Sequence, residues 1–438
     1  MALKTNSQLE RLRLSGIRRF SALAARTPGC VSLTLGEPGE DTPAPVRAEV
    51  ARDLDRGLTH YPPNNGYPWL REAIASRERA RGVPADVADP EGVIVTCGAT
   101  EALAVALTVV LEPGDEVVIP TPAFSLYESL TTLVRGVPVA LDTAPAGFQV
   151  SREALEAKVT GRTKAIVLCS PNNPTGCVLD AASLDVVACA AAEHDLFVIC
   201  DDVYESLVYA SSYQRFSARH PELSDRVLVA GSFSKPWAMT GWRLGWLLAR
   251  PELAAQASKV HQYLVSSVPA FVQHAALRAL EWDVRPMRDS YRERRDLTVA
   301  ALEGMGLPLV EPEGAFYAFP SVSALGLGSE EFCERAILEA GVALVPGVFF
   351  GAEGYVRLSF ACDRETLEEG LARLAGFVGA LRAEGGERRL ARRSGSPTSS
   401  CSPATAATCT ASPSWTSTST RRSPTSWISS GRSRPTRA

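Results

Sequence analysis

The feature that most restricts the fold of this chain is an alternation of short apolar runs with helical patterns across its middle. Helical patterns at 100–111 and 182–194 separate several of these runs, which we interpret as buried strands. Strands that alternate with helices form a mainly parallel sheet with helices on both faces, and ligands bind at the carboxyl ends of its strands. The predicted strands are 93–96, 116–120, 137–141, 165–169, 197–200, 227–230 and 244–248.

A second pattern predicts a smaller α+β domain. A long polar helical pattern at 284–305 is followed by short strand-like runs at 315–319 and 356–360, interleaved with helical stretches. We expect the N-terminal segment to complete this domain. The predicted division is an N-terminal segment at 1–45, a large domain at 46–283, a small domain at 284–384 and a tail at 385–438.

The tail differs in composition from the rest of the chain. It is rich in Ser, Thr, Pro and Arg, and residues 391–438 contain no Asp, Glu or Lys. A segment without apolar periodicity cannot bury enough surface to offset the entropy of ordering. We therefore predict that the tail is disordered, and a frame-shifted or read-through end is the alternative interpretation.

Composition narrows the class of protein. A formal net charge of -4 argues against nucleic acid as a partner. The ten cysteines include no C-x-x-C pair, which favours a reducing, cytoplasmic location. The five histidines show no metal-ligand spacing, so no metal is expected. No apolar run approaches the ~20 residues of a membrane span, so no membrane partner is expected either.

One lysine stands out among the five in the chain. Lys235 lies in the run G-S-F-S-K-P-W-A-M-T-G-W-R, which supplies hydroxyls, glycines and Arg243 around it. Arginine does not form imines, whereas lysine does once its pKa is lowered. A lone lysine is usually a solvated surface charge, and the other four fit that description. Lys235 is therefore the candidate for a covalent bond to a phosphate-bearing aldehyde cofactor.

Three other strand ends carry polar residues. Residues 98–100 (Gly98 to Thr100) open a helix and form a candidate anion-binding site, although an ordinary turn has the same pattern. The run S-P-N-N-P-T-G fixes a rigid loop around Asn173, or is a plain turn. Asp201 follows a buried strand, with Tyr204 three residues on. A buried carboxylate needs a partner, which is either a structural arginine, backbone amides or a protonated ring nitrogen such as that of pyridoxal 5'-phosphate (PLP).

In this order and spacing, the runs S-P-N-N-P-T-G, D-D-V-Y and S-F-S-K-P-W-A-M-T-G-W-R resemble the fold-type I PLP-dependent aminotransferases. The closest likeness is to the bacterial subgroup of the aspartate/aromatic aminotransferase family, and it covers residues 16–376. The runs L-G-E-P, H-Y-P-P-N-N-G and G-A-T-E-A-L support it. The resemblance implies an α/β large domain, whose mainly parallel sheet has helices on both faces, plus a smaller α+β domain.

The resemblance also implies roles around the cofactor. Lys235 forms an aldimine with PLP and moves a proton, Asp201 keeps the ring nitrogen protonated, and Asn173 and Tyr204 bind the 3'-oxygen. Phe124 stacks on the ring. The residues implied for the phosphate are Ser232, Ser234, Arg243 and the amides of Ala99 and Thr100.

The substrate and the neighbouring subunit complete the implied site. Arg357 binds the substrate α-carboxylate in a bidentate pair, aided by the backbone of Gly36 and by Asn173. Tyr61 reaches the phosphate of a neighbouring subunit, which implies a homodimer with shared active sites. Aspartate-specific relatives have a lysine in the stretch where this chain has Thr100. We therefore expect an aromatic, aliphatic or sulfur-containing amino donor; the alternative is an acidic side chain bound by Arg18 or Arg19.

The function that the resemblance implies is amino-acid metabolism by transamination. The amino group moves between an amino acid and a 2-oxo acid through the Lys235 aldimine and a pyridoxamine intermediate. The alternative is another PLP reaction on the same fold, by a β-elimination lyase, a cyclase or a deaminase, because the fold does not choose among these chemistries.

Overall fold

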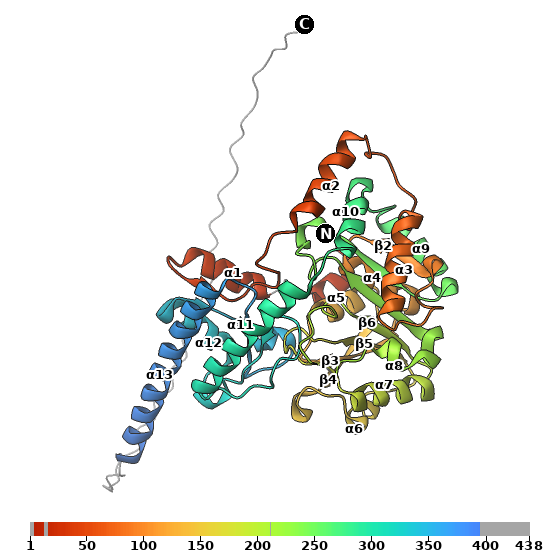
Figure 1. Ribbon diagram of the computed structural model, residues 1–438. Helices are drawn as coiled ribbons and strands as arrows, with labels where there is room; N and C mark the ends of the chain where they lie inside the picture. The colour runs from red at the N-terminus through yellow and green to blue at the C-terminus, as the bar shows by residue number, and fades with distance from the viewer. Residues whose placement is uncertain (1–3, 13–15, 211, 395–438) are drawn as a thin grey trace, which may run out of the picture. The chain divides into compact units, whose positions relative to one another are not determined.

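A seven-stranded sheet forms the centre of the larger part of the chain. The computed structural model describes residues 4–12, 16–210 and 212–394 (Figure 1). The strand order is β2-β8-β7-β6-β5-β3-β4; β8 runs antiparallel to both its neighbours and the other pairs are parallel. The strands are β2 (Val93–Thr96), β3 (Glu116–Thr121), β4 (Val137–Asp142), β5 (Thr163–Cys169), β6 (Phe197–Asp201), β7 (Val227–Ser232) and β8 (Gly245–Leu248). The predicted mainly parallel sheet is therefore confirmed.

Helices cover both faces of this sheet because the strands are apolar on both sides. In β6, Ile199 packs into one hydrophobic cluster with Leu103 of α4 (Ala99–Val110). Val198 packs into a second cluster with Ile74 of α3 (Pro68–Ala80) and Val187 of α7 (Ala181–Glu193). Successive strand residues point to opposite faces, so an uninterrupted apolar strand requires cover on both. The helices are α1 (Gly16–Arg26), α2 (Ala44–Asp55), α3 (Pro68–Ala80), α4 (Ala99–Val110), α5 (Leu126–Leu133), α6 (Arg152–Glu156), α7 (Ala181–Glu193), α8 (Phe216–Arg219), α9 (Pro251–Leu264), α10 (Ala270–Leu280), α11 (Arg285–Gly304), α12 (Ser329–Ala340) and α13 (Arg364–Ser394).

The smaller α+β part contains two short sheets. One is antiparallel, with β12 (Val356–Ser359) between β11 (Val345–Pro346) and β9 (Tyr317–Ala318). The other pairs β1 (Val31–Ser32) with β10 (Val342–Ala343) in parallel. The N-terminal strand β1 thus pairs with the C-terminal strand β10.

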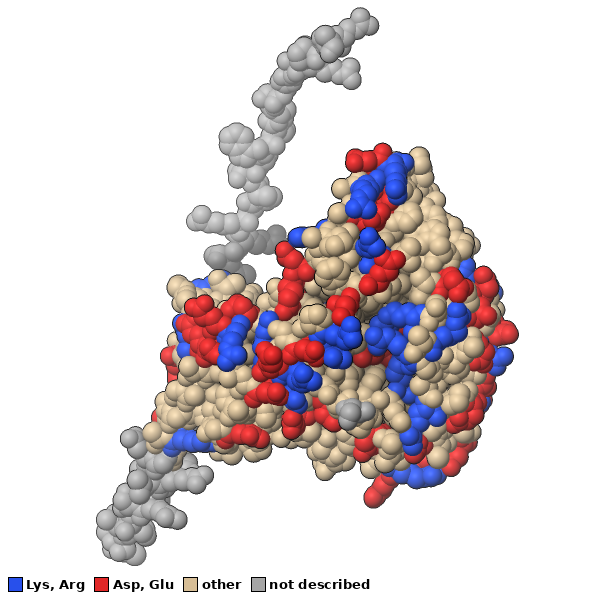
Figure 2. Space-filling view, in the orientation of Figure 1, with Lys and Arg blue, Asp and Glu red and all other residues tan. Residues whose placement is uncertain are grey.

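The domain boundaries remain predictions. Residues Met1–Arg389 contact one another as one compact unit. Helix α13 continues to Ser394, and the rest of the predicted disordered tail, residues 395–438, lies outside the described residues. Within the described ranges no helix has the length and apolar character to cross a membrane. Acidic and basic side chains are interspersed over the face in Figure 2.

Candidate active site

Ten of the residues predicted for the site line one cavity of about 230 Å³. It lies where β5, β6 and β7 end and α4 begins, which is where ligands bind in sheets of this kind. These ten are Ala99, Thr100, Phe124, Asn173, Asp201, Tyr204, Ser232, Ser234, Lys235 and Arg243. The arrangement brings together residues that are up to 144 positions apart in the sequence, since Ala99 and Arg243 face the same space.

Lys235 is the lysine that lines this cavity. It lies in the loop after β7, and its Nζ donates a hydrogen bond to the carbonyl oxygen of Gly36. The rings of Tyr204 and Phe316 lie 5.8 and 5.7 Å from Nζ. Burial, helped by the charge of Arg357, lowers the pKa of Lys235 to about 8. An amine with this pKa is partly neutral near pH 7 and can attack a carbonyl carbon.

Asp201 is the buried carboxylate of the site. It ends β6, and its Oδ2 accepts a hydrogen bond of 2.6 Å from the phenol of Tyr127, a residue of α5 that also lines the cavity. Burial raises the pKa of Asp201 to about 6, against the hydrogen bond from Tyr127, which lowers it. A cation beside this carboxylate would favour its ionised form. Tyr127 carries no motif of its own, so the sequence did not single it out.

Tyr204 and Asn173 reach the same space from neighbouring strand ends. The hydroxyl of Tyr204 is 2.9 Å from the hydroxyl of Tyr317 in β9, and burial raises the pKa of Tyr204 well above its usual value. Asn173 Oδ1 accepts a hydrogen bond of 2.9 Å from Arg357 Nη1. Because the amide oxygen is occupied, the amide NH₂ group of Asn173 is left as a donor. Tyr317 is a second residue that sequence reasoning missed.

The start of α4 forms the end of the cavity where hydrogen-bond donors gather. Gly98 precedes the helix with φ of 79°, and a Cβ atom there would lie 2.7 Å from Arg243 Nη2, so the guanidinium packs closely against this turn. Ser232 Oγ accepts a hydrogen bond of 3.0 Å from the amide of Ser234. A helix N-terminus, two hydroxyls and a guanidinium together favour a phosphate group.

Arg357 is a buried cation without a carboxylate partner in the described part of the chain. Arg357 is only 2% exposed. Its Nη2 donates a hydrogen bond of 2.8 Å to the carbonyl oxygen of Thr34, whereas its Nε has no hydrogen-bond partner among the described residues. Its guanidinium carbon lies 4.5 Å from the ring centroid of Tyr317 and 5.0 Å from that of Phe350. Buried guanidinium groups are normally paired, so this one is suited to bind an anion.

These groups fit PLP when judged by their own chemistry. The donors at α4 suit its phosphate, Asp201 suits a protonated ring nitrogen, and Lys235 suits its aldehyde. Arg357, with its unpartnered Nε, suits the carboxylate of a bound amino acid.

Tyr61 lies apart from this constellation. It is 91% exposed and does not line the cavity with the other residues. Its predicted role toward a neighbouring subunit stays a prediction.

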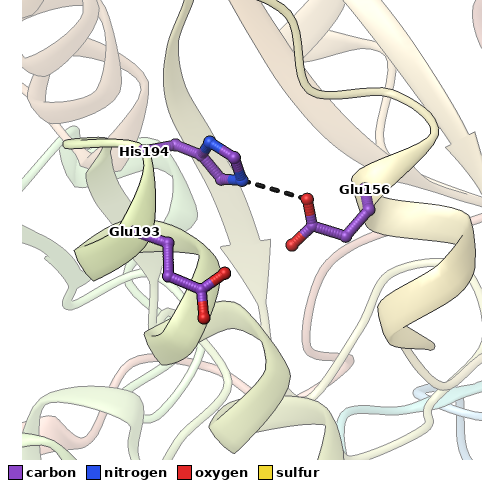
Figure 3. Close-up of side chains that lie close together, drawn as sticks. All are labelled: Glu156, Glu193 and His194. Atoms are coloured by element: carbon purple, nitrogen blue, oxygen red, sulfur yellow. Dashed lines mark hydrogen bonds and ion pairs between the residues drawn. The ribbon is translucent and has the colours of Figure 1, made fainter.

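One group of possible metal ligands occurs in the described ranges. Glu156 of α6 lies near Glu193 and His194 at the end of α7, with His194 Nε2 3.0 Å from Glu156 (Figure 3). Arg152 donates hydrogen bonds to both oxygens of Glu193, so one of the two carboxylates of this surface cluster already has an arginine partner. The expectation that the protein uses no metal stays a prediction.

Most of this chain is similar in sequence and in structure to known proteins. The family described as aminotransferase class I and II matches residues 28–374. An aspartate aminotransferase of Pyrococcus abyssi is 40% identical over 378 residues, covering 84% of this chain and 97% of that protein. An aromatic-amino-acid aminotransferase of Thermococcus litoralis is 39% identical, with the same coverage. The solved structure of an aspartate aminotransferase double mutant from Thermus thermophilus superposes with a TM-score of 0.80 at 35% identity, covering 86% of this chain and 100% of that chain.

Proposed function

The chain belongs to the family of class I and II aminotransferases, and from that premise we propose that Lys235, Asp201 and Arg357 carry its reaction. The protein is a PLP-dependent aminotransferase of fold type I that moves an amino group between an amino acid and a 2-oxo acid. PLP supplies an aldehyde that takes up the amino group and a ring that withdraws electrons from the substrate Cα. The observation that best supports these roles is the buried, carboxylate-free Arg357, whose Nη1 donates to Asn173 on the wall of the cavity that holds Lys235.

The roles that we propose follow from the charge and position of each group. Lys235 would hold the aldehyde until the substrate amine displaces it, and the freed amine, whose pKa is depressed, would then carry a proton to and from the substrate Cα. Asp201 holds the ring nitrogen protonated. Arg357 binds the substrate α-carboxylate with the help of the Gly36 backbone.

The remaining residues orient the cofactor. Asn173 and Tyr204 donate hydrogen bonds to its 3'-oxygen, and Phe124 stacks on its ring. Its phosphate is held by Ser232, Ser234, Arg243 and the amides of Ala99 and Thr100. All of these side chains or backbones line the one cavity.

We propose that the amino donor has an uncharged, apolar side chain. The cations that line the cavity are Lys235 and Arg243, which we assign to the cofactor, and the nearby Arg357 is assigned to the α-carboxylate. Thr100 and Leu103 line the cavity from the N-terminal part of α4, where no basic side chain faces the cavity among the described residues.

We also propose that the protein is a homodimer in which Tyr61 enters the partner's site. Tyr61 is 91% exposed and Tyr263, at the end of α9, is 88% exposed. The two lie on elements in contact, because Asn64 Nδ2 donates 3.0 Å to Ser258 Oγ of α9. Exposed aromatic side chains on adjoining elements are typical of a subunit interface.

A cytoplasmic location is the last part of this proposal. The cysteines in the described ranges are free, and Cys169, Cys177, Cys200 and Cys333 are buried. Buried thiols without disulfides are typical of a reducing compartment.

A half-reaction assay tests the proposed function. The purified protein loaded with PLP is mixed with single amino donors, and its visible absorbance is followed together with the product. We expect phenylalanine, leucine or methionine to bleach the cofactor and release one 2-oxo acid per site. Release of ammonia or of a β-substituent without bleaching would contradict transamination, and bleaching only by aspartate or glutamate would contradict the proposed donor class.

A further inference from the structure

A buried ionic cluster lies directly behind the site, on the segment that follows β6. Asp201, the last residue of β6, and Tyr204 of this segment line the cavity. Their neighbours Asp202 and Glu205 are also buried but form ion pairs with arginines instead. Residues 201–205 therefore alternate between groups that line the cavity and acidic groups paired with arginines.

Arg77 of α3 contacts this segment. Its Nη2 donates hydrogen bonds of 2.5 Å to Glu205 Oε1 and 2.8 Å to Ser206 Oγ, and its Nη1 donates to Glu78. Both hydrogen bonds from Nη2 reach residues within two positions of Tyr204. The side chain of Arg77 is 12% exposed, so these contacts form largely out of water.

The same guanidinium also contacts the loop of the catalytic lysine. The Arg77 guanidinium carbon lies 5.2 Å from the ring centroid of Trp237, two residues after Lys235, and 5.8 Å from that of Trp246. A cation over an indole face is attracted by the ring electrons, more strongly where water is excluded. Arg77 thus bridges the Tyr204 segment and the Lys235 loop.

Stability alone is a poor explanation for this cluster. Burial would raise the pKa of Glu205, but Arg77 and Arg81 lower it, so the carboxylate stays charged inside the protein. Buried ion pairs lose hydration, and well-packed apolar residues often replace them without loss of stability. The best-attested use of such groups is to fix one arrangement of the chain.

We propose that Arg77 is a positioning residue that fixes the Tyr204 segment and the Lys235 loop at the spacing that one cofactor requires. It acts through Glu205 and Trp237, and it is not a lining residue of the cavity. This inference rests on the proposed roles of Lys235 and Tyr204.

The test compares Arg77→Lys and Glu205→Gln with the control Arg81→Met. Lysine keeps the positive charge but loses the planar guanidinium group. Glu205→Gln weakens the contact between Arg77 and position 205 while keeping the shape of the side chain. Arg81 shares Glu205, with a contact of 2.5 Å, but has no described contact with Trp237. Three quantities are measured on each protein: the Kd of the apoprotein for PLP, the pH midpoint of the absorbance change of bound PLP, and the melting temperature.

We expect Arg77→Lys and Glu205→Gln to raise the Kd for PLP about tenfold and to shift the pH midpoint of the absorbance, with Arg81→Met close to the wild type. A melting temperature near that of the wild type would separate positioning from general destabilisation. If Arg77→Lys keeps the wild-type Kd and midpoint, or if Arg81→Met changes both equally, the inference is wrong. A wild-type protein that takes up no PLP would overturn the proposed function, and this inference with it.

Discussion

The phenol of Tyr127 donates a hydrogen bond of 2.6 Å to Oδ2 of Asp201. The donor comes from α5 and the acceptor ends β6, and both line the cavity. Hydrogen bonds to a carboxylate stabilise its ionised form, so Tyr127 opposes the effect of burial on Asp201. The charge that Asp201 would present to the cofactor ring is therefore set partly by Tyr127, a residue outside every recognised motif.

Replacing Tyr127 by phenylalanine is expected to raise the pKa of Asp201 further above its present value of about 6. Loss of one hydrogen bond to a charged group corresponds to roughly one to two pKa units. Asp201 must be ionised to pair with a cationic ring. As the pH decreases, the affinity for PLP should therefore begin to fall at a higher pH in the variant than in the wild type. The measurement is the Kd of the apoprotein for PLP as a function of pH.

Tyr209→Phe is the matched control for this experiment. The Tyr209 hydroxyl donates to the carbonyl oxygen of Ala315 and does not contact Asp201. The proposed role of the Tyr127 hydrogen bond would be contradicted if the pH at which PLP affinity falls did not change for Tyr127→Phe. It would also be contradicted if that pH changed equally for Tyr209→Phe.

The lowered pKa of Lys235 predicts how fast the apoprotein captures PLP at different pH values. Only the neutral amine attacks the aldehyde, and the pKa of this amine is about 8. The capture rate should rise about tenfold per pH unit below that value and level off above it. Stopped-flow absorbance between about pH 6.5 and 10 measures it. A rate that keeps rising up to pH 10 would mean that Lys235 titrates as an ordinary surface lysine.

Sequence patterns predicted the sheet and most of the residues that line the cavity, because apolar runs and turn residues are local features of the sequence. The apolar runs at 93–96 and 227–230 became β2 and β7, and Lys235 lies in the loop that follows β7. The motif residues lie in rigid turns or at strand ends. Because parallel strands end at the same edge of a sheet, these residues come together there.

The contributions of Tyr127, Tyr317 and Arg77 depend on packing between distant segments and leave no local pattern. Tyr317 meets Tyr204 across 113 positions, and Arg77 meets Glu205 across 128. A tyrosine or arginine in a helix or short strand has the same sequence signature whether it faces solvent or a buried partner. Only the three-dimensional contacts distinguish these cases.

Replacing Arg357 by glutamine should weaken binding of every amino and 2-oxo acid substrate. Glutamine keeps a donor for Asn173 Oδ1 but loses the charge and the fork that suit a carboxylate. We expect KM to rise by roughly ten- to a hundredfold, equivalent to about 1.5 to 3 kcal/mol, with a smaller change in PLP affinity. Arg364→Gln, at the exposed start of α13, is the control. An unchanged KM would remove Arg357 from the substrate site.

Lys235→Arg tests the covalent residue while preserving positive charge. Arginine does not condense with the aldehyde, so turnover should fall by at least about 10³-fold. Borohydride reduction followed by peptide mapping should leave a pyridoxyl label on the peptide of Lys235 in the wild type and none in the variant. Lys259→Arg, whose lysine contacts only Gln256 among its described hydrogen-bond partners, should keep both label and turnover. Labelling at another lysine in the wild type would refute the assignment.

Mixing two inactive variants tests whether Tyr61 serves the partner's site. Tyr61→Ala should bind PLP weakly, and Lys235→Arg should not react with it. If Tyr61 acts across the interface, each mixed dimer contains one site with both native residues, because the native lysine comes from one subunit and the native tyrosine from the other. Random exchange places both variants together in about half of the dimers, so about a quarter of all sites should regain activity. If Tyr61 acts within its own subunit, no site in the mixture has both residues and activity stays at the level of the single variants. The second outcome, or a monomer by sedimentation, would contradict the shared-site dimer while leaving the assignment of Lys235 intact.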